Sequence, residues 1–321
     1  MLFAKLGPHV QLPSSQAFRF AQAAPVVKSI DNVGVLQAAP PGAITIFRHY
    51  FGGQDINRYG GDVARNVLDA LGGYRPTYVE LYNETSQRLH NGLDRYITLH
   101  EEAAPVIHAQ GIGLAGFCFS TGNPEPEDWQ HIQARGFGGV DVLAIHEYWG
   151  NQGLSTWNAL RYRRVHEWLG GSHPPFVITE TGRDQVEGGA AGWIASGVSA
   201  EQYLGELMAY DNAISQDWYV LGGTIFTAGP NGDWVNFNVD PLVDAIVGGG
   251  DPTPTCPPGF HLEGNICVPD FVPQPVPSTG EIPWWVFFGV GAIATGAVLL
   301  AATATPPGES YPPLITPGFG R

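Results

Sequence analysis

Short apolar segments alternate with segments of helical periodicity along the first 250 residues. Eight of the apolar segments have the length of buried strands and are bounded by turn-forming residues. These predicted strands cover residues 5–11, 26–30, 43–50, 77–84, 114–120, 140–148, 175–182 and 220–227. Helices are predicted at 16–24, 62–71, 93–110, 156–169 and 200–214, and paired glycines end two of them.

Eight strands separated by helical segments within about 250 residues are typical of a (β/α)8 TIM barrel in the α/β class. The crossovers after the second and the fifth strand have weak helical periodicity. An open, doubly wound sheet is therefore the alternative, because it also alternates strands with helices.

Two of the predicted strands end in a glutamate. Period-two alternation places Glu84 on the same face as Glu80 and Tyr82, at the carboxyl end of the fourth strand. The seventh strand carries Glu180 in the same position. Functional residues of barrel enzymes lie at the carboxyl ends of the strands, and a pair of carboxylic acids is the equipment for cleaving glycosidic bonds.

The two motifs resemble those of the clan A glycoside hydrolases. The first reads Val-Glu-Leu-Tyr-Asn-Glu over 79–84, and the second reads Ile-Thr-Glu-Thr-Gly over 178–182. The resemblance covers residues 1 to about 247. It implies that Glu84 is the acid/base, that Asn83 contacts the sugar 2-hydroxyl, and that Glu180 is the nucleophile of a retaining hydrolase.

Further candidates lie at the ends of other predicted strands. His146 and Tyr148 are two residues apart and share a face, and similar clan members have a His-x-Tyr pair there. Arg48 is a candidate for holding the nucleophile ionised, and Glu80 for a structural ion pair. Tryptophans in predicted loops are candidate platforms for sugar rings: Trp129, Trp149 and Trp234. The clan usually has tryptophan at the end of the eighth strand, where this chain has Phe226.

The composition excludes some function classes. Only 14% of the residues are charged, and 30 acidic against 15 basic residues give a net charge of −15. A chain of this charge cannot neutralise a row of phosphates, so no nucleic acid partner is expected. No glycine-rich phosphate loop follows a strand, and no cluster has the spacing of metal ligands, so we expect no cofactor and no metal.

The chain changes character after Gly250, so residues 1–250 are predicted to form the barrel domain. Residues 251–281 are rich in proline and are predicted to form a stalk. Cys256 and Cys267 bracket a short loop in it, and we expect a disulfide bond there, which implies an oxidising compartment. A zinc site is the alternative, although His261 would add only a third ligand.

Residues 282–305 contain no charged side chain and begin with Pro-Trp-Trp after Ile282. This length and the flanking tryptophans predict a transmembrane helix, followed by a short tail at 306–321. The alternative is a helix that packs in a protein assembly, because its small residues suit close packing. We expect a membrane anchor with the barrel outside the cytoplasm, although no signal peptide is visible before the first strand.

The sequence therefore predicts a membrane-anchored, retaining glycoside hydrolase that acts on a β-linked glycan. The alternative is a barrel without catalysis that serves as a surface, assembly or carbohydrate-binding protein. Whether Glu84 and Glu180 face each other across an open cleft separates the two hypotheses.

Overall fold

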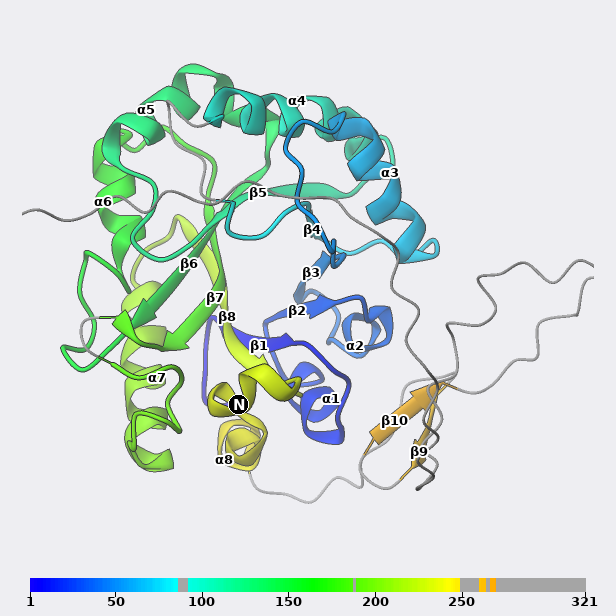
Figure 1. Ribbon diagram of the computed structural model, residues 1–321. Helices are drawn as coiled ribbons and strands as arrows, with labels where there is room; N and C mark the ends of the chain where they lie inside the picture. The colour runs from blue at the N-terminus through cyan, green and yellow to red at the C-terminus, as the bar shows by residue number, and fades with distance from the viewer. Residues whose placement is uncertain (86–91, 187–188, 249–259, 264–265, 270–321) are drawn as a thin grey trace, which may run out of the picture. The chain divides into compact units, whose positions relative to one another are not determined.

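The computed structural model describes residues 1–85, 92–186, 189–248, 260–263 and 266–269. Within these residues eight parallel strands form a closed barrel in the order of the sequence, from β1 to β8, and β1 pairs with both β2 and β8. Helices lie around the outside of the barrel (Figure 1). The predicted (β/α)8 barrel is confirmed, and an open doubly wound sheet is excluded because no strand of the barrel is an edge strand.

The strand boundaries agree with the apolar segments except at the fourth strand. The strands are β1 (Leu6–Val10), β2 (Val26–Ile30), β3 (Ile44–Arg48), β4 (Tyr78–Glu80), β5 (Gly113–Phe119), β6 (Val142–Trp149), β7 (Phe176–Arg183) and β8 (Val220–Ala228). The prediction that the fourth strand continues to residue 84 is wrong, because β4 ends at Glu80.

The α-helices of the described residues are α1 (Ser15–Ala21), α2 (Val33–Gln37), α3 (Gly60–Leu71), α4 (Leu93–His108), α5 (Pro126–Ala134), α6 (Arg161–Trp168), α7 (Ala200–Ser215) and α8 (Val243–Val247). They include three that the periodicity did not predict, α2, α5 and α8. The crossover after β5 contains α5, which starts with Pro126 and a capping box between Glu125 and Asp128. Such a start signal identifies a helix too short to show clear periodicity.

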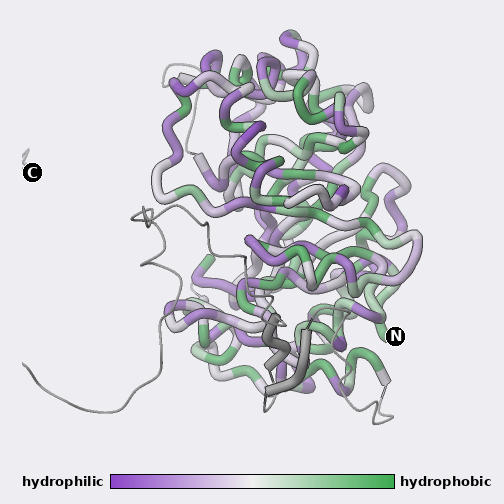
Figure 2. The backbone as a smooth tube through the Cα atoms, turned by 90° about the vertical axis from the view of Figure 1, so that its right-hand side faces the viewer, coloured by the Kyte–Doolittle hydropathy of each residue, from purple (hydrophilic) through white to green (hydrophobic). Residues whose placement is uncertain are grey.

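The barrel wall separates two apolar clusters. The larger cluster packs the outer face of the strands against the helices and includes Val27 and Phe47. The smaller cluster, which we call the apolar floor, fills the barrel interior with Val26, Ile46, Ala115, Cys118, Val142, Ala144 and Val177. Hydrophobic and hydrophilic residues are interspersed along the barrel chain (Figure 2).

A two-stranded antiparallel hairpin lies within the predicted stalk. It consists of β9 (Phe260–Glu263) and β10 (Ile266–Pro269), with Ile266 opposite Glu263. A stalk without regular structure was expected, and this is corrected for these eight residues. The signal in the sequence is the alternation of apolar residues on both sides of Gly264-Asn265, a dipeptide that favours hairpin turns.

Several predictions about the C-terminal part lie outside the described residues. Cys256 is not among them, so the disulfide bond with Cys267 stays a prediction, as do the domain boundaries at 250, 281 and 305. In the described part of the chain no helix is both long and apolar enough to cross a bilayer. The expected anchor at 282–305 and the tail at 306–321 belong to the residues that are not described.

Candidate active site

A pocket of about 640 Å³ opens at the carboxyl ends of the barrel strands. Segments at or after β1, β2, β3, β4, β6, β7 and β8 contribute to its wall, and η3 (Gly232–Phe237) closes one side. Its lining residues are Gln11, Leu12, Ile30, Asp31, Arg48, Tyr50, Asn83, Glu84, Tyr148, Glu180, Asp184, Phe226, Asn231, Asp233, Trp234 and Phe237. The pocket therefore holds both glutamates that the sequence singled out.

Glu180 lies on β7 and is only 5% exposed. The register between β6 and β7 shifts between the pairs Ile145–Ile178 and His146–Glu180, and this irregularity places Glu180 opposite His146. Regular alternation from Val177 of the apolar floor would have turned Glu180 out of the barrel. Each of its carboxylate oxygens has a separate set of neighbours. Oε2 accepts a hydrogen bond from the Tyr148 hydroxyl at 3.0 Å and lies 3.4 Å from His146 Nδ1. Oε1 lies near three nitrogens, Lys28 Nζ at 3.5 Å, Arg48 Nη1 at 3.6 Å and His9 Nδ1 at 3.6 Å.

Glu84 reaches the same place by a different backbone geometry. It lies beyond the end of β4 with φ of 51°, in the left-handed region, and its amide donates to the Cys118 carbonyl at 2.9 Å. Left-handed backbone is uncommon for a residue with a side chain, and such positions are concentrated at functional sites. Leu81 and Tyr82 are both buried in the outer core. The turn, and not strand alternation, therefore brings Glu84 into the pocket.

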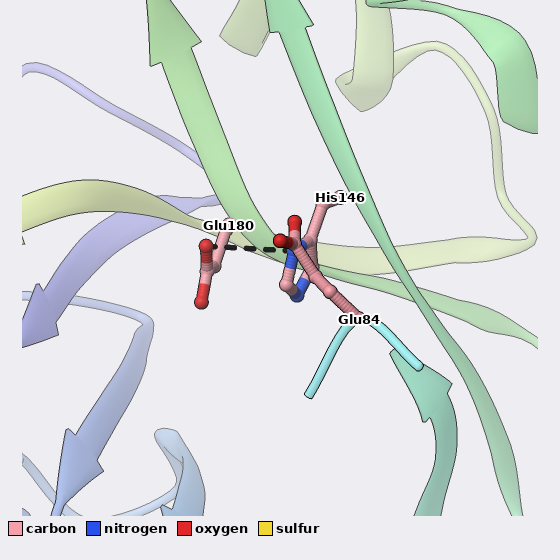
Figure 3. Close-up of side chains that lie close together, drawn as sticks. All are labelled: Glu84, His146 and Glu180. Carbon is pink, nitrogen blue, oxygen red and sulfur yellow. Dashed lines mark hydrogen bonds and ion pairs between the residues drawn. The ribbon is translucent and has the colours of Figure 1, made fainter. Parts of the chain in front are cut away.

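The side chains of Glu84, His146 and Glu180 converge from three segments of the chain (Figure 3). His146 Nδ1 lies 2.7 Å from Glu84 Oε1 and 3.4 Å from Glu180 Oε2, so it lies between the two carboxylates. An oxygen of Glu84 and an oxygen of Glu180 lie within 4.8 Å of each other. The structure thus brings together two carboxyl groups that are 96 positions apart in the sequence.

These three side chains also offer one metal-ligating atom each within 4.8 Å. The charges around Glu180 make a metal ion a poor fit, because Lys28 and Arg48 already place two cations beside its carboxylate. A divalent ion there would face like charge at short range. The charges of these residues therefore do not suit a metal ion.

The pKa of the Glu84 carboxyl is lowered. Burial acts in the opposite direction and raises it, but the hydrogen bond from His146 and the positive charges of His146, Lys28 and Arg48 outweigh burial. The side chain is still 40% exposed, in contrast with Glu180 at 7%. Its neighbours thus favour the ionised form of Glu84.

A charged layer lies between the apolar floor and the two glutamates. Lys28 and Glu80 are completely buried, and their Nζ and Oε2 atoms are 2.8 Å apart, which is the ion pair expected for Glu80. His9 is also buried, and burial together with Lys28, Arg48 and His146 holds its pKa well below the usual value. Sequence reasoning assigned no role to Lys28, although it shares a strand face with Val26 of the floor.

Arg48 and Asn83 are joined in the pocket wall. Arg48 Nη1 donates to Asn83 Oδ1 at 2.8 Å, and Gln54 Nε2 donates to the Asn83 carbonyl at 2.8 Å. Gln54 was not singled out from the sequence. Its contacts orient the turn that carries both Asn83 and Glu84, because the Asn83 amide also donates to the Gln54 side chain.

The prediction of a sugar platform is wrong for two of the three tryptophans. Trp149 is the last residue of β6 and is completely buried, and its indole Nε1 donates to Glu206 outside the barrel at 2.9 Å. Trp129 belongs to α5 and packs against Phe119 in the core. Both side chains follow the general tendency of tryptophan to be buried. Neither lines the pocket.

Trp234 does line the pocket and is 40% exposed. Its ring contacts Phe226 edge to face at a centroid distance of 5.2 Å, and Phe226 takes the position at the end of β8. Tyr50, which follows β3, is another exposed aromatic residue of the pocket wall, at 62%. The aromatic surfaces available to a ligand thus come from segments after β3 and β8.

Aspartates at the rim were not predicted as site residues. Asp31 lines the pocket, and its Oδ1 lies 2.6 Å from His49 Nδ1. Asp184 follows β7, and burial together with the charge of Glu84 raises its pKa. Loop aspartates carry no periodicity signal, so only the folded barrel shows that they surround the pocket.

No family model matches the chain, and no curated protein matches it. Among solved structures, an endo-β-1,3-glucanase of glycoside hydrolase family 128 from Amycolatopsis mediterranei, in complex with laminaritriose, is similar in fold. The match has 14% identity and a TM-score of 0.49, and it covers 73% of this chain and 92% of that one. A β-mannanase from Thermomonospora fusca matches at 14% identity and a TM-score of 0.47, covering 74% and 83%. At these values the likeness is one of fold alone.

Proposed function

We propose that the chain is a retaining glycoside hydrolase that cleaves a β-linked glycan, with Glu180 as nucleophile and Glu84 as acid/base. The observation that carries the proposal is the approach of the two carboxyl groups, with oxygens within 4.8 Å, in an open pocket at the barrel mouth. Retaining enzymes have their carboxyl groups about 5–5.5 Å apart, whereas inverting enzymes need about 6.5–9.5 Å to admit a water molecule. The choice of a β-linkage rests on the resemblance of the two glutamate motifs to clan A.

The first step requires an ionised Glu180 and a proton on Glu84. The Glu180 carboxylate attacks the anomeric carbon, the bond to the leaving oxygen breaks, and that oxygen takes the proton from Glu84. Lys28 and Arg48 favour the ionised nucleophile, and Tyr148 donates to its other oxygen. A covalent glycosyl ester on Glu180 and an ionised Glu84 result.

The second step uses the same groups in reversed roles. Glu84 removes a proton from a water molecule, the hydroxide oxygen attacks the anomeric carbon, and the ester bond to Glu180 breaks. Glu84 is more exposed than Glu180, as a residue that exchanges protons with leaving group and water must be. A bound sugar ring displaces water from Glu84 and adds to the burial that already acts to raise its pKa. Substrate binding therefore favours the protonated form needed for the first step.

The charges of the pocket favour a neutral glycan. Among the described residues its lining includes five carboxylate residues, Asp31, Glu84, Glu180, Asp184 and Asp233, and a single base, Arg48, which already donates to Asn83. An anionic sugar would meet like charge in this described part of the lining, which offers it no free cation. Trp234 and Tyr50 provide apolar ring faces on which neutral sugars stack.

The test is hydrolysis of a panel of neutral and anionic β-glycans and aryl glycosides, with the anomer of the first product followed by proton NMR. We expect turnover of a neutral glycan with retention and none by Glu180→Gln. Glu201→Gln is the matched control, because Glu201 is exposed in the first turn of α7, outside the pocket. Product of inverted configuration would contradict the mechanism. Glycan binding without turnover by any substrate would favour the carbohydrate-binding alternative.

We also propose that residues 282–305 anchor the barrel to a membrane outside the cytoplasm, with Cys256 and Cys267 joined in the stalk. The support is the absence of charge over these 24 positions and the flanking tryptophans. The full-length protein should partition into detergent, and a chain that ends at Gly250 should remain in the aqueous phase. Full-length protein that remains dispersed without detergent or self-assembly would overturn both the anchor and the assembly helix.

A further inference from the structure

Lys28 is a charged side chain in the layer of the barrel interior directly above the apolar floor. It is one of only two lysines in the chain and is completely buried. Directly beneath it on β2 lies Val26 of the apolar floor. Burial of an ion costs several kcal/mol, and a buried ion pair alone is no more stabilising than apolar residues of the same size. A contribution to stability through the ion pair with Glu80 therefore does not explain why a lysine is buried at this position.

The position of the Lys28 ammonium explains why a lysine is buried there. Nζ lies 2.8 Å from Glu80 Oε2 and 3.5 Å from Glu180 Oε1, so one cation bridges two carboxylates from β4 and β7. Arg48 is the other cation near Glu180, but its side chain is 12% exposed and already donates to Asn83. Water screens an exposed charge more than a buried one, so the field of Lys28 at Glu180 is the less screened of the two.

We propose that Lys28, anchored by Glu80, is a positioning residue that keeps Glu180 ionised while the neighbouring Glu84 holds a proton. The inference rests on the proposed function. Charge balance shows the consequence. Glu80, Glu84 and Glu180 bring three negative charges, and Lys28 and Arg48 bring two positive charges. The cluster becomes neutral when it binds one proton, which the hydrogen-bonded pair of His146 and Glu84 can hold and which Glu84 must deliver to the leaving group.

The other groups around this cluster do not replace Lys28. His9 on β1 is held neutral by burial and by the neighbouring cations. Burial raises the pKa values of Cys118 on β5 and Tyr148 on β6 well above their usual range, so both are uncharged. Asp184 beyond β7 adds only negative charge, and His146 lies nearer to Glu84 than to Glu180. Lys28 is therefore the buried permanent cation beside the nucleophile among the described residues.

The test uses three variants that separate charge from folding. Lys28→Met removes the cation but leaves Glu80 buried without an ion-pair partner, which destabilises the folded state. The double variant Lys28→Met/Glu80→Gln removes both charges and keeps the volumes. Glu80→Gln alone leaves Lys28 with Glu180 as its sole carboxylate neighbour. The pH profile of kcat/KM is measured for each variant and for the wild type.

We expect the double variant to lose activity about tenfold or more on the acidic side, with the acidic limb displaced to higher pH. This is the loss expected when an opposite charge at this range is removed from a carboxylate. Glu80→Gln should displace the profile in the opposite direction, because it removes a negative charge from the same cluster. A double variant with the wild-type pH profile would reduce the Lys28–Glu80 pair to a structural role and overturn the inference.

A second measurement is independent of turnover. The carboxyl ¹³C resonance of Glu180, assigned by its absence in Glu180→Gln, is followed through a pH titration in the wild type and the double variant. Its midpoint should move to higher pH in the double variant even if no glycan is cleaved, in which case the proposed function fails and the role of Lys28 stands. An unmoved midpoint overturns the role of Lys28, whether or not the wild type cleaves glycans.

Discussion

The carboxyl ends of β4 and β7 each present one glutamate to the same pocket, in opposite settings. Glu180 lies within β7, where a register shift places it opposite His146, its side chain is 7% exposed, and cations lie on one side of its carboxylate. Glu84 lies in a left-handed turn beyond its strand, has a side chain 40% exposed and has His146 as its close partner. In the proposed mechanism these two settings match two tasks, because an ionised nucleophile needs fixed neighbouring cations, and a proton carrier needs access to water and an exchangeable proton.

The largest expected effect is at the end of β7. Glu180→Gly should lower turnover by roughly 10⁴-fold or more, because no covalent intermediate can form. Added azide should restore turnover of an activated aryl glycoside by attacking in place of the carboxylate, with an inverted azide product that NMR identifies. Glu201→Gln is the control. Undiminished hydrolysis by Glu180→Gly would show that Glu180 is not the nucleophile.

The effect at the end of β4 should depend on the leaving group. Glu84→Gln should slow the cleavage of natural glycosides by about 10²–10⁴-fold, the usual contribution of a general acid. Activated aryl glycosides need little protonation, so the release of their leaving group should be far less affected in a single-turnover measurement. Equal losses for both substrates would mean that the two glutamates do not have different roles.

A third glutamate, Glu147, shows how burial outside the pocket changes the pKa of a carboxyl group. Glu147 on β6 points away from the barrel interior, where it accepts from the Tyr210 hydroxyl at 2.6 Å and the Tyr162 amide at 2.8 Å. Burial raises its pKa to about 8. Its folded-state pKa is thus above the unfolded value, so the native state binds the extra proton and stability falls as pH rises from about 4.5 to about 8.

Glu147→Gln should remove this dependence, because the amide resembles the protonated acid. At roughly 1.4 kcal/mol per unit of pKa, the wild type should lose up to about 4 kcal/mol relative to the variant across this range. Denaturant unfolding at pH 5 and pH 8 measures the difference. Equal slopes in both proteins would show that Glu147 is ionised in the folded state.

The pKa of Glu84 offers a finer test. His146→Gln removes the hydrogen bond and the positive charge that lower this pKa, so the pKa should rise. In the proposed mechanism Glu84 must be protonated, and the alkaline limb of kcat/KM should therefore move to higher pH. A limb that moves to lower pH would show that His146, and not Glu84, provides the proton.

The smallest expected effect concerns the aromatic wall. Trp234→Ala should raise KM by about tenfold or less with little change in kcat, since aromatic contacts contribute about 0.5–1.5 kcal/mol. Trp218→Ala is the matched control, because Trp218 is 81% exposed and does not line the pocket. An equal change in both variants would exclude Trp234 as a sugar platform.

The sequence determined the barrel because local patterns encode it. Apolar runs such as 26–30 and 175–182 are long enough to predict strands from the local pattern alone. Glu180 could be assigned to the carboxyl end of the seventh strand because it belongs to such a run. Helix α5 carried a capping signal that periodicity alone misses, since a short helix has too few turns to show a period.

Only the tertiary structure decided how the site is composed. The alternation that linked Glu84 to Glu80 was misleading, because the chain leaves β4 at Glu80 and a left-handed turn at Glu84 redirects the side chain. Trp149 was placed in a loop, but packing against the outer helices holds its indole away from the pocket. Lys28 has no distinguishing neighbour in the sequence, and its partners lie 52 and 152 positions away. Strand identity depends on residues close in sequence, whereas the charge of a buried group depends on what the closed barrel brings within a few ångströms of it.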